Sequence, residues 1–205
     1  MKLYYAPGAC SLAPHIVARE AGLHIELEKV DLGSGKTETG AAFAEINPKG
    51  YVPALALDEG GVLTEASVIV QYLADKAPQA QLVPARGTSE HYRLLEWLGF
   101  ISTEIHKGFG PLWNAKMPAA AKDLAKANLG KRFAYLDRHL AQRQFLLGDR
   151  FSIADAYLFT VANWTNFHAI DVAPYPALKT YLERVAARPK VREAMAAEGL
   201  LKQAA

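Results

Sequence analysis

The order of apolar and polar residues changes quickly along the N-terminal part of the chain, where short runs predict alternating strands and helices. The run KLYYA predicts a strand that ends before Pro7, and the alternating run IELEKVDL predicts a second strand over residues 25–32. Between these runs, apolar side chains recur at helical spacing over residues 11–21, and Gly22 ends the predicted helix.

A second group of elements follows a polar, glycine-rich loop. A short helix is predicted around residues 41–45, and the runs VPALAL and GVLT, separated by DEGG, predict a β-hairpin. The run EASVIVQYLADKA then predicts a helix that ends before Pro78. Strands joined by a helix lie parallel and hairpin strands lie antiparallel, so this part of the chain predicts a mixed four-stranded sheet with helices on its faces.

The rest of the chain has a different pattern. The run APQAQLVPARG is typical of a linker, and the segments beyond it are rich in Ala, Leu, Lys and Arg and contain no strand-like run. Helices are predicted over residues 89–109, 119–141, 153–167 and 177–187, with a short one after Pro189. We therefore expect an α/β domain over residues 1–80, a linker over 81–87 and an all-helical domain over 88–205.

Composition narrows the class of protein. Half of the 205 residues are hydrophobic, and the 23 basic residues are scattered along a chain of net charge +2, which argues against a nucleic-acid partner. A single cysteine excludes an internal disulfide framework and suits a reducing compartment. Neither a leader-like N-terminal segment nor an apolar run near the ~20 residues that span a bilayer is present. We expect a cytoplasmic protein with no membrane partner.

The single cysteine, Cys10, lies in the turn between the first predicted strand and the first predicted helix. The unpaired N–H groups and the dipole at a helix N-terminus stabilise an anion, which favours a reactive thiolate. A lone cysteine is also commonly a small buried apolar side chain, so position alone leaves both interpretations open. Without a second cysteine, a reactive Cys10 would form mixed disulfides only with a thiol outside the chain.

Two further stretches each have a structural and a functional interpretation. Pro53 opens a predicted strand, either as an ordinary turn proline or, with a cis peptide bond, as a fixed feature near a functional surface. In TEAS, Thr64 is predicted to cap the following helix. The first N–H groups of that helix and the Glu65 carboxylate could together hold the carboxylate and ammonium of an amino acid. A capped helix with an acid in its first turn explains the same residues.

The helical part contains two stretches with polar residues at helix ends. TEIHKGFGPLW places His106 at the end of a predicted helix, as a structural hydrogen-bonding group or as a catalytic one. Phe109 and Trp113 beside it belong either to the core or to an apolar substrate wall. In FSIADAY, Ser152 and Asp155 predict a capping box, a structural device worth about 1 kcal/mol for the serine.

Two other patterns predict no site. GSGKT at residues 33–37 lacks the first glycine of a phosphate-binding loop, because Val30 stands at that position. The six histidines include no H-x-x-x-H pair and have no neighbouring cysteines, so no metal site is predicted.

Taken together and in this order, YYAPGACSLAPH, NPKGYVPAL, LTEASVIVQYLAD, EIHKGF and FSIADAYLF closely resemble the bacterial beta-class glutathione S-transferases. The resemblance runs nearly from end to end. It implies a thioredoxin-like domain that binds glutathione, followed by an all-helical domain with a hydrophobic substrate site. It also implies a homodimer, and glutathione as co-substrate without a metal.

The resemblance implies roles for individual residues. Cys10 faces the glutathione sulfur and His106 forms a hydrogen bond near it, so these two are the expected catalytic residues. Val52, beside a cis Pro53, offers its backbone N–H and C=O to the cysteinyl part of glutathione. The other expected glutathione contacts are Gly35, Lys36, Glu65, Ala66, Ser67, Gly99, Thr103, Glu104 and Lys107, and the expected hydrophobic wall is Phe109, Trp113 and Trp164.

The sequence departs from the family pattern at three of these contacts. Glu65 and the amide of Ala66 are expected at the γ-glutamyl end, but Ala66 stands where many transferases have serine, so the next serine would supply any hydroxyl. Gly35 stands where relatives often have lysine, and Lys36 beside it is expected to take over the contact with the glycyl carboxylate. Gly99 stands where relatives often have asparagine. These departures predict weaker glutathione affinity, with the function retained.

The expected reaction is the conjugation of glutathione to small hydrophobic electrophiles, as in detoxification. Binding lowers the pKa of the glutathione thiol, and the thiolate attacks the electrophile. The closest alternative is a Cys10-dependent thioltransferase reaction, and the two reactions can coexist in one enzyme. The other alternative is a non-catalytic module of the same fold that binds ligands or proteins. Cys10, Glu65 and His106 together favour the enzyme, because a scaffold needs none of them. The residues do not identify the electrophile.

Overall fold

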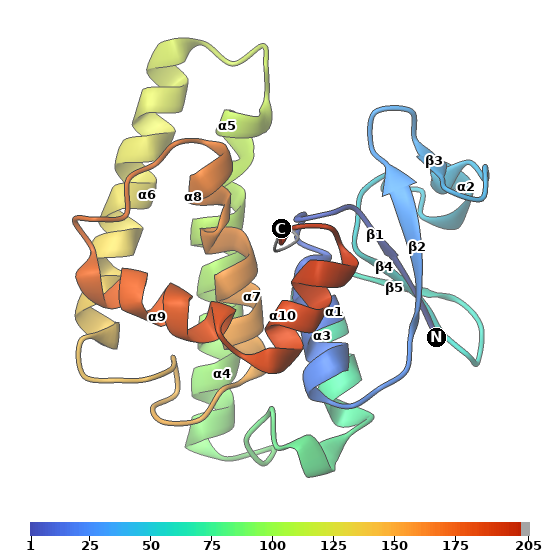
Figure 1. Ribbon diagram of the computed structural model, residues 1–205, viewed down its shortest axis with the longest axis horizontal. Helices are drawn as coiled ribbons and strands as arrows, with labels where there is room; N and C mark the ends of the chain where they lie inside the picture. Colours follow the sequence, from blue (N-terminus) through green and yellow to red (C-terminus); the bar gives the residue numbers. More distant parts are fainter. Residues whose placement is uncertain (202–205) are drawn as a thin grey trace. The chain divides into compact units, whose positions relative to one another are not determined.

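The computed structural model describes residues 1–201, which divide into two compact units (Figure 1). The first unit consists of Met1–Val83 together with the chain from Ala187 onward, and the second consists of Pro84–Ala186. The last helix therefore groups with the N-terminal part of the chain, whereas the sequence prediction placed all of residues 88–205 in the helical domain. Within residues 1–201, no helix is long and apolar enough to cross a membrane.

The first unit is built on a mixed sheet, as predicted. Its strands are β1 (Lys2–Tyr5), β2 (Glu26–Asp31), β3 (Lys36–Thr37), β4 (Ala54–Ala56) and β5 (Val62–Thr64), in the spatial order β3-β2-β1-β4-β5. β1 and β2 are parallel, and all other neighbouring strands are antiparallel. The predicted number of four strands was wrong, because β3 adds a fifth. Its two residues are too few to show an alternating pattern, and the chain returns to β2 through a turn at Gly35 (φ 68°).

Helices cover both faces of this sheet. They are α1 (Leu12–Glu20), α2 (Phe43–Ile46), α3 (Ala66–Asp75) and α10 (Pro189–Ala197), with a 3₁₀ turn over Pro78–Ala80. α1 packs against α3 and α10 on one face, and α2 lies by the other (Figure 1). Tyr4 points to the α2 face, with its ring 5.8 Å from that of Phe43, so the adjacent Leu3 points to the opposite face. Both strand faces are buried, which is why KLYY lacks an apolar–polar alternation.

The second unit is all-helical. Its segments are α4 (Ser89–Phe100), the π-helical η2 (Ile101–His106), the 3₁₀ segment η3 (Lys107–Phe109), α5 (Gly110–Trp113), α6 (Ala119–Leu140), α7 (Ile153–Ala162), α8 (Trp164–Phe167) and α9 (Pro176–Ala186). α7 is buried along its whole length and contacts α4, η2 and α9. Two of the predicted single helices were wrong in extent: residues 89–109 form three segments of different pitch, and residues 153–167 are divided at Asn163.

The capping box at the start of α7 is confirmed. The backbone N–H and the hydroxyl of Ser152 both donate to Asp155 Oδ2, at 2.8 and 2.7 Å. The other carboxylate oxygen accepts the Leu146 N–H at 2.9 Å and the Tyr181 hydroxyl at 3.1 Å. Asp155 thereby joins the loop before α7 to α9, and burial raises the pKa of its carboxyl.

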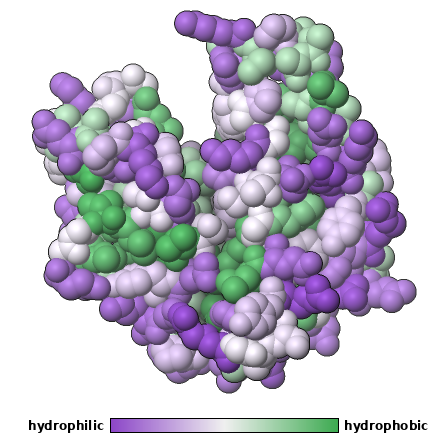
Figure 2. Space-filling model, turned by 180° about the vertical axis from the view of Figure 1, so that it is seen from behind, coloured by the Kyte–Doolittle hydropathy of each residue, from purple (hydrophilic) through white to green (hydrophobic). Residues whose placement is uncertain are grey.

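Hydrophobic residues also reach the surface. On the face drawn in Figure 2, hydrophobic residues gather in patches between hydrophilic ones. Among the large apolar side chains, Trp113 and Phe167 are more than half exposed. Isolated surface apolar residues are normal in proteins, but a group of aromatic ones is a candidate contact surface.

Candidate functional site

Cys10 lies in a tight loop between β1 and α1, where the sequence predicted it. Its side chain is 9% exposed, and its Sγ donates a hydrogen bond to the Val52 carbonyl oxygen at 3.1 Å. The loop closes on itself, because the Ser11 hydroxyl bonds to the backbone N–H and carbonyl of Ala6. α1 begins at Leu12, so the sulfur lies just before the positive end of the helix dipole.

Glu198, in the last turn of the chain described, also holds this loop, and sequence reasoning missed it. Its Oε2 accepts the Gly8 N–H at 2.9 Å, and its Oε1 lies 2.9 Å from Nδ1 of His15, whose side chain is fully buried. Arg19 Nε donates to His15 Nε2 at 3.4 Å, which leaves Nδ1 as the nitrogen that donates to Glu198. The His15 ring is thus engaged by Glu198 and Arg19. No local sequence signal links residues 190 positions apart.

The segment opposite Cys10 contains Val52 and Pro53, whose peptide bond is cis. Val52 is buried and accepts the Cys10 hydrogen bond through its carbonyl. The preceding turn is held by Asn47, whose Nδ2 donates to the Tyr51 carbonyl at 2.7 Å and whose Oδ1 accepts the Lys49 N–H at 3.2 Å. The cysteine and the cis-proline segment, 42 residues apart in sequence, are therefore in direct contact.

Glu65 and the start of α3 form the predicted amino-acid-binding feature. Glu65 has a φ of 69°, in the left-handed region, and its carbonyl accepts the first helical bonds from Val68 and Ile69. The N–H groups of Ala66 and Ser67 therefore lie in the first turn, where no helical carbonyl precedes them. The predicted Thr64 cap was wrong: Glu65 occupies the capping position, and the Thr64 hydroxyl instead accepts a bond from Lys49.

The Glu65 carboxylate has partners that sequence reasoning did not include. Its Oε1 accepts hydrogen bonds from Lys49 Nζ at 2.7 Å and from the Tyr51 hydroxyl at 2.9 Å. The hydrogen bond to Glu65 raises the pKa of the Lys49 ammonium and also that of the Tyr51 phenol. At neutral pH the group is therefore a charged carboxylate–ammonium pair with a neutral phenol beside it.

Gly35 and Lys36 lie at the edge of the same sheet. Gly35 forms the turn that leads into β3, and its N–H donates to the Asp31 carbonyl at 2.8 Å. Lys36 is exposed on β3. The edge strand β3 is separated by β2 from β1, and Cys10 lies in the loop after β1. Gly35 and Lys36 are therefore the most peripheral of the predicted contacts in this unit.

The remaining predicted residues lie in the second unit, around η2 and η3. His106, the last residue of the π-helical segment, has its Nδ1 2.6 Å from the hydroxyl of buried Tyr157 and packs edge-on against Trp164. π-helical turns are frequent at functional sites, and here one determines where His106 projects. The partner Tyr157 was not predicted, because it lies on α7 within an apolar run that indicates only a core helix.

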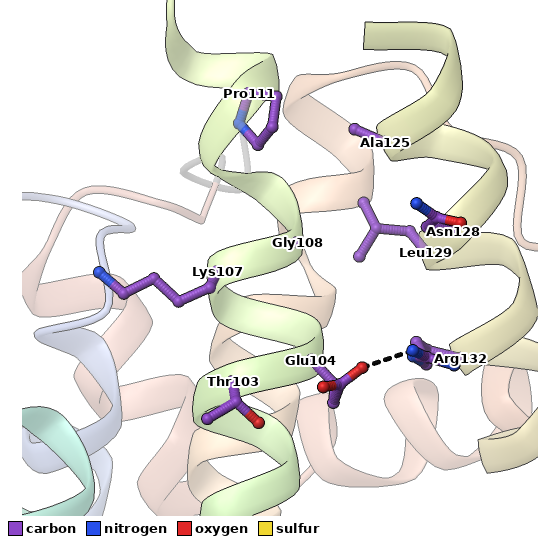
Figure 3. A pocket seen from close by; sticks show the side chains of 9 residues that line it. All are labelled: Thr103, Glu104, Lys107, Gly108, Pro111, Ala125, Asn128, Leu129 and Arg132. Carbon is purple, nitrogen blue, oxygen red and sulfur yellow. Dashed lines mark ion pairs between the residues drawn. The ribbon is translucent and has the colours of Figure 1, made fainter. Parts of the chain in front are cut away.

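A pocket lined by both polar and apolar residues lies between this segment and α6. It has a volume of about 340 Å³ and is lined by Thr103, Glu104, Lys107, Gly108, Pro111, Ala125, Asn128, Leu129 and Arg132 (Figure 3). Glu104 pairs with Arg132 on α6 at 2.6 Å, an interaction that sequence reasoning missed. The Thr103 hydroxyl donates to the Gly99 carbonyl at 3.1 Å, and the Lys107 side chain points away from α6 (Figure 3).

The three aromatic residues predicted as a hydrophobic wall are in contact with one another. The ring of Trp164 lies 5.6 Å from that of Phe109 and 5.5 Å from that of Trp113, edge-on in both cases. Phe109 is fully buried, Trp164 is nearly so, and Trp113 is 51% exposed. Only Trp113 of the three therefore offers a broad surface to a ligand, while the other two support it.

The predicted residues thus form two groups. Cys10, Val52, Pro53, Glu65, Ala66 and Ser67 lie in the first unit, and His106 with the aromatic residues lies in the second. Among residues 1–201 no group of three or more His, Cys, Asp or Glu side chains is arranged to hold a metal ion. The first group can hold an amino-acid-like ligand next to a thiol, and the second combines an imidazole with an apolar surface.

Comparison with known proteins finds two family models and many similar chains. The model for the glutathione S-transferase N-terminal domain matches residues 8–76, and that for the C-terminal domain matches residues 100–189. Glutathione S-transferase GstA of Escherichia coli O157:H7 is 44% identical over 200 residues, which cover 98% of this chain and 100% of the relative.

Two solved structures are similar over almost the whole chain. A crystal structure of a glutathione transferase from Methylococcus capsulatus str. Bath is 60% identical with a TM-score of 0.96, covering 98% of this chain and 99% of that one. A sphingomonad glutathione S-transferase complexed with glutathione is 47% identical with a TM-score of 0.94, covering 98% and 100%.

Proposed function

The chain belongs to the glutathione S-transferase family, and from that premise we propose that it binds reduced glutathione and conjugates it through its sulfur to small hydrophobic electrophiles. Its beta-class relatives and the thioredoxin-like and helical domains agree with this enzyme class. The observation that carries the proposal is the 3.1 Å hydrogen bond from Cys10 Sγ to the Val52 carbonyl. In the proposed complex the same carbonyl receives the cysteinyl N–H of glutathione, which puts the sulfur of the co-substrate beside Cys10.

The glutathione site is proposed to be built mainly on the first unit. Val52 holds the cysteinyl part next to Pro53, and Glu65 takes the α-ammonium of the γ-glutamyl part. The α-carboxylate of that part lies on the first N–H groups of α3, at Ala66 and Ser67, where the helix dipole favours an anion. Lys36, on the strand after Gly35, pairs with the glycyl carboxylate. On the family resemblance, Gly99, Thr103, Glu104, His106 and Lys107 are the further proposed contacts.

The proposed chemistry needs a thiolate and an apolar surface. The glutathione thiol gives its proton to solvent, and the thiolate is stabilised by the N-terminus of α1 and by a hydrogen bond from His106. Tyr157 contacts His106 at Nδ1 and so fixes the orientation of the imidazole ring. The sulfur lone pair forms the new C–S bond, and the leaving group departs with its bonding electrons. Trp113, supported by Phe109 and Trp164, is proposed to bind the electrophile.

A thioltransferase reaction is the second candidate, and the isolation of Cys10 favours it. The Cys10 thiolate attacks the glutathione sulfur of a mixed disulfide, forms a Cys10–glutathione disulfide and releases the other thiolate. A second glutathione thiolate then attacks the bound glutathione sulfur, which yields glutathione disulfide and regenerates the Cys10 thiolate. No second cysteine exists to resolve the intermediate within the chain, so an outside thiol must do so.

We expect the enzyme to act as a cytoplasmic homodimer. Exposed apolar side chains such as Val68, Tyr92 and Tyr135, at 42%, 62% and 45%, are available for an interface between copies. Size-exclusion chromatography with light scattering tests this, and a monomer at micromolar concentration would contradict it.

The proposed function is tested by binding and turnover together. Wild type, Cys10→Ala, Glu65→Gln and the exposed control Glu45→Gln are applied to immobilised glutathione, eluted with free glutathione and assayed with chlorodinitrobenzene. Wild type and the Glu45 variant should be retained and active, and Glu65→Gln should be retained weakly. Activity in Cys10→Ala together with loss of disulfide reduction would assign Cys10 to the second reaction. Wild type that is neither retained nor active would refute the proposal.

A further inference from the structure

Lys49 and Tyr51, to which neither the family comparison nor the proposed chemistry assigns a role, form a hydrogen-bonded cluster with Glu65. Lys49 Nζ lies 2.7 Å from Glu65 Oε1 and 2.9 Å from the Thr64 hydroxyl oxygen. The Tyr51 hydroxyl donates to the same Glu65 oxygen at 2.9 Å. The Glu65 carboxylate thus has a primary ammonium as its partner.

The backbone brings these side chains together from two segments. Lys49 and Tyr51 lie in the turn held by Asn47, and Gly50 between them has a φ of 72°. A left-handed residue between them turns the chain, so that both side chains reach the same carboxylate. Glu65 is presented from the other side by its own left-handed backbone at the start of α3. The pairing is therefore built into two defined turns.

The ion pair is loose enough to exchange. The Lys49 and Glu65 side chains are 47% and 50% exposed, and exposed ion pairs contribute little to stability. A lysine side chain is long and flexible and can return its ammonium to water at small cost. The Tyr51 hydroxyl is a neutral donor on a rigid ring, so it can keep its bond to Glu65 while the cation is exchanged.

The proposed function places the α-ammonium of glutathione on Glu65, and resting on that function we propose that Lys49 is a placeholder for it. Lys49 pairs with Glu65 and leaves when the γ-glutamyl ammonium arrives. Both groups are primary ammonium ions that donate to a carboxylate, and two of them on one oxygen would repel each other. Lys49 therefore sets the affinity for glutathione by competition, because the ligand must replace an interaction that already exists.

The inference predicts opposite behaviour for ligands with and without the ammonium. Removing Lys49 frees Glu65 for glutathione, and binding should tighten by about two- to fivefold, the range expected for one exposed ion pair. A glutathione analogue without the α-amino group cannot use the freed carboxylate, so its binding should not tighten. Such a difference between two ligands separates competition from a general change in charge or space.

The experiment measures dissociation constants by isothermal titration calorimetry for wild type, Lys49→Met and Lys190→Met. Lys190 is the matched control, because its pair with Glu193 has a similar length, 2.8 Å, and similar exposure, 48% and 46%. The ligands are S-methylglutathione, which excludes thiol exchange with Cys10, and its des-amino counterpart S-methyl-glutaryl-cysteinylglycine. Lys49→Met should bind S-methylglutathione about two- to fivefold more tightly, and Lys190→Met should match wild type.

An unchanged or weaker complex of Lys49→Met with S-methylglutathione overturns the inference, and so does equal tightening toward both ligands. Either result with normal wild-type binding leaves the proposed function in place. If wild type itself does not bind S-methylglutathione, the proposed function fails and the placeholder role fails with it.

Discussion

Replacing Glu198 by glutamine should loosen the loop that carries Cys10. The carboxylate accepts two buried hydrogen bonds, from the Gly8 N–H and from Nδ1 of His15, both at 2.9 Å. A glutamine offers one acceptor oxygen, and its NH₂ group must face one of the two donors. Losing a buried hydrogen bond in this way lowers the free energy of unfolding by about 1–3 kcal/mol. For a chain of this length, each kcal/mol lowers the Tm by about 2–4 °C.

The functional consequence can be measured separately from stability. Cys10 is the single cysteine and is 9% exposed, so its rate of reaction with Ellman's reagent reports the opening of its loop. If the lost 1–3 kcal/mol acts on that opening, Glu198→Gln should label about fivefold to a hundredfold faster than wild type in native buffer, since 1.4 kcal/mol corresponds to tenfold.

Glu20→Gln is the matched control for this measurement. Glu20 pairs with Arg188 at 2.7 and 2.8 Å and links α1 to the residue before α10, but at the end of α1 remote from Cys10. It should lower the Tm without accelerating the labelling. If Glu198→Gln labels no faster than Glu20→Gln, Glu198 is a general anchor between the two helices, and the reasoning about the Cys10 loop is refuted.

Three further predictions concern the helical unit. A Cβ at Gly108 would lie 2.8 Å from Leu129 Cδ2, so Gly108→Ala should lower the free energy of unfolding by about 1–3 kcal/mol. Gly110→Ala is the control, because a Cβ there would have no atom within 4 Å apart from its chain neighbours and the backbone of its own helix. Equal urea midpoints for the two variants would contradict this prediction. Phe109→Ala removes a fully buried ring and should lower the free energy of unfolding by about 3–5 kcal/mol. Trp113→Ala, at an exposed ring, should leave the urea midpoint nearly unchanged and raise the KM for an aromatic electrophile. An unchanged KM would remove Trp113 from the proposed wall. Burial lowers the pKa of His139 from 6.5, so the folded state binds the proton less readily than the unfolded state. This contribution to stability is present above pH 6.5 and is lost as the pH falls below it. His139→Gln should therefore lose less stability than wild type between about pH 7.5 and about pH 5, and parallel plots of unfolding free energy against pH for the two proteins would contradict the assignment.

The sequence predicted those parts of the fold whose signals are local. The mixed sheet, the helical second part and the Ser152–Asp155 capping box all follow from patterns of a few neighbouring residues, and the structure confirms them. β3 was missed because two residues cannot show periodicity. The π-helical segment was missed because its residues have the same apolar spacing as an α-helix, and the bond from Thr103 to the Gly99 carbonyl is visible only in the folded chain.

The residues of the candidate site also divide into those with a local sequence signal and those without one. Cys10, Pro53 and Glu65 stand at turns and helix starts, where the residue type itself indicates chemistry. Their partners carry no such signal. Glu198 was one acid among many in a terminal helix, and Lys49 was one lysine in a polar turn. The grouping of α10 with the first unit is equally a long-range result, since helical periodicity shows which face is apolar but not what covers it.

Three contacts that position the site join the end of one element to a residue distant in sequence. Cys10 is held by Val52, Gly8 by Glu198, and His106 by Tyr157. A group at the end of a strand or helix has few neighbours from its own element, so its orientation depends on one or two such bonds. Substitutions that change glutathione affinity without touching glutathione should therefore concentrate at these supporting residues. The interiors of β1 and α3, by contrast, should respond through stability alone.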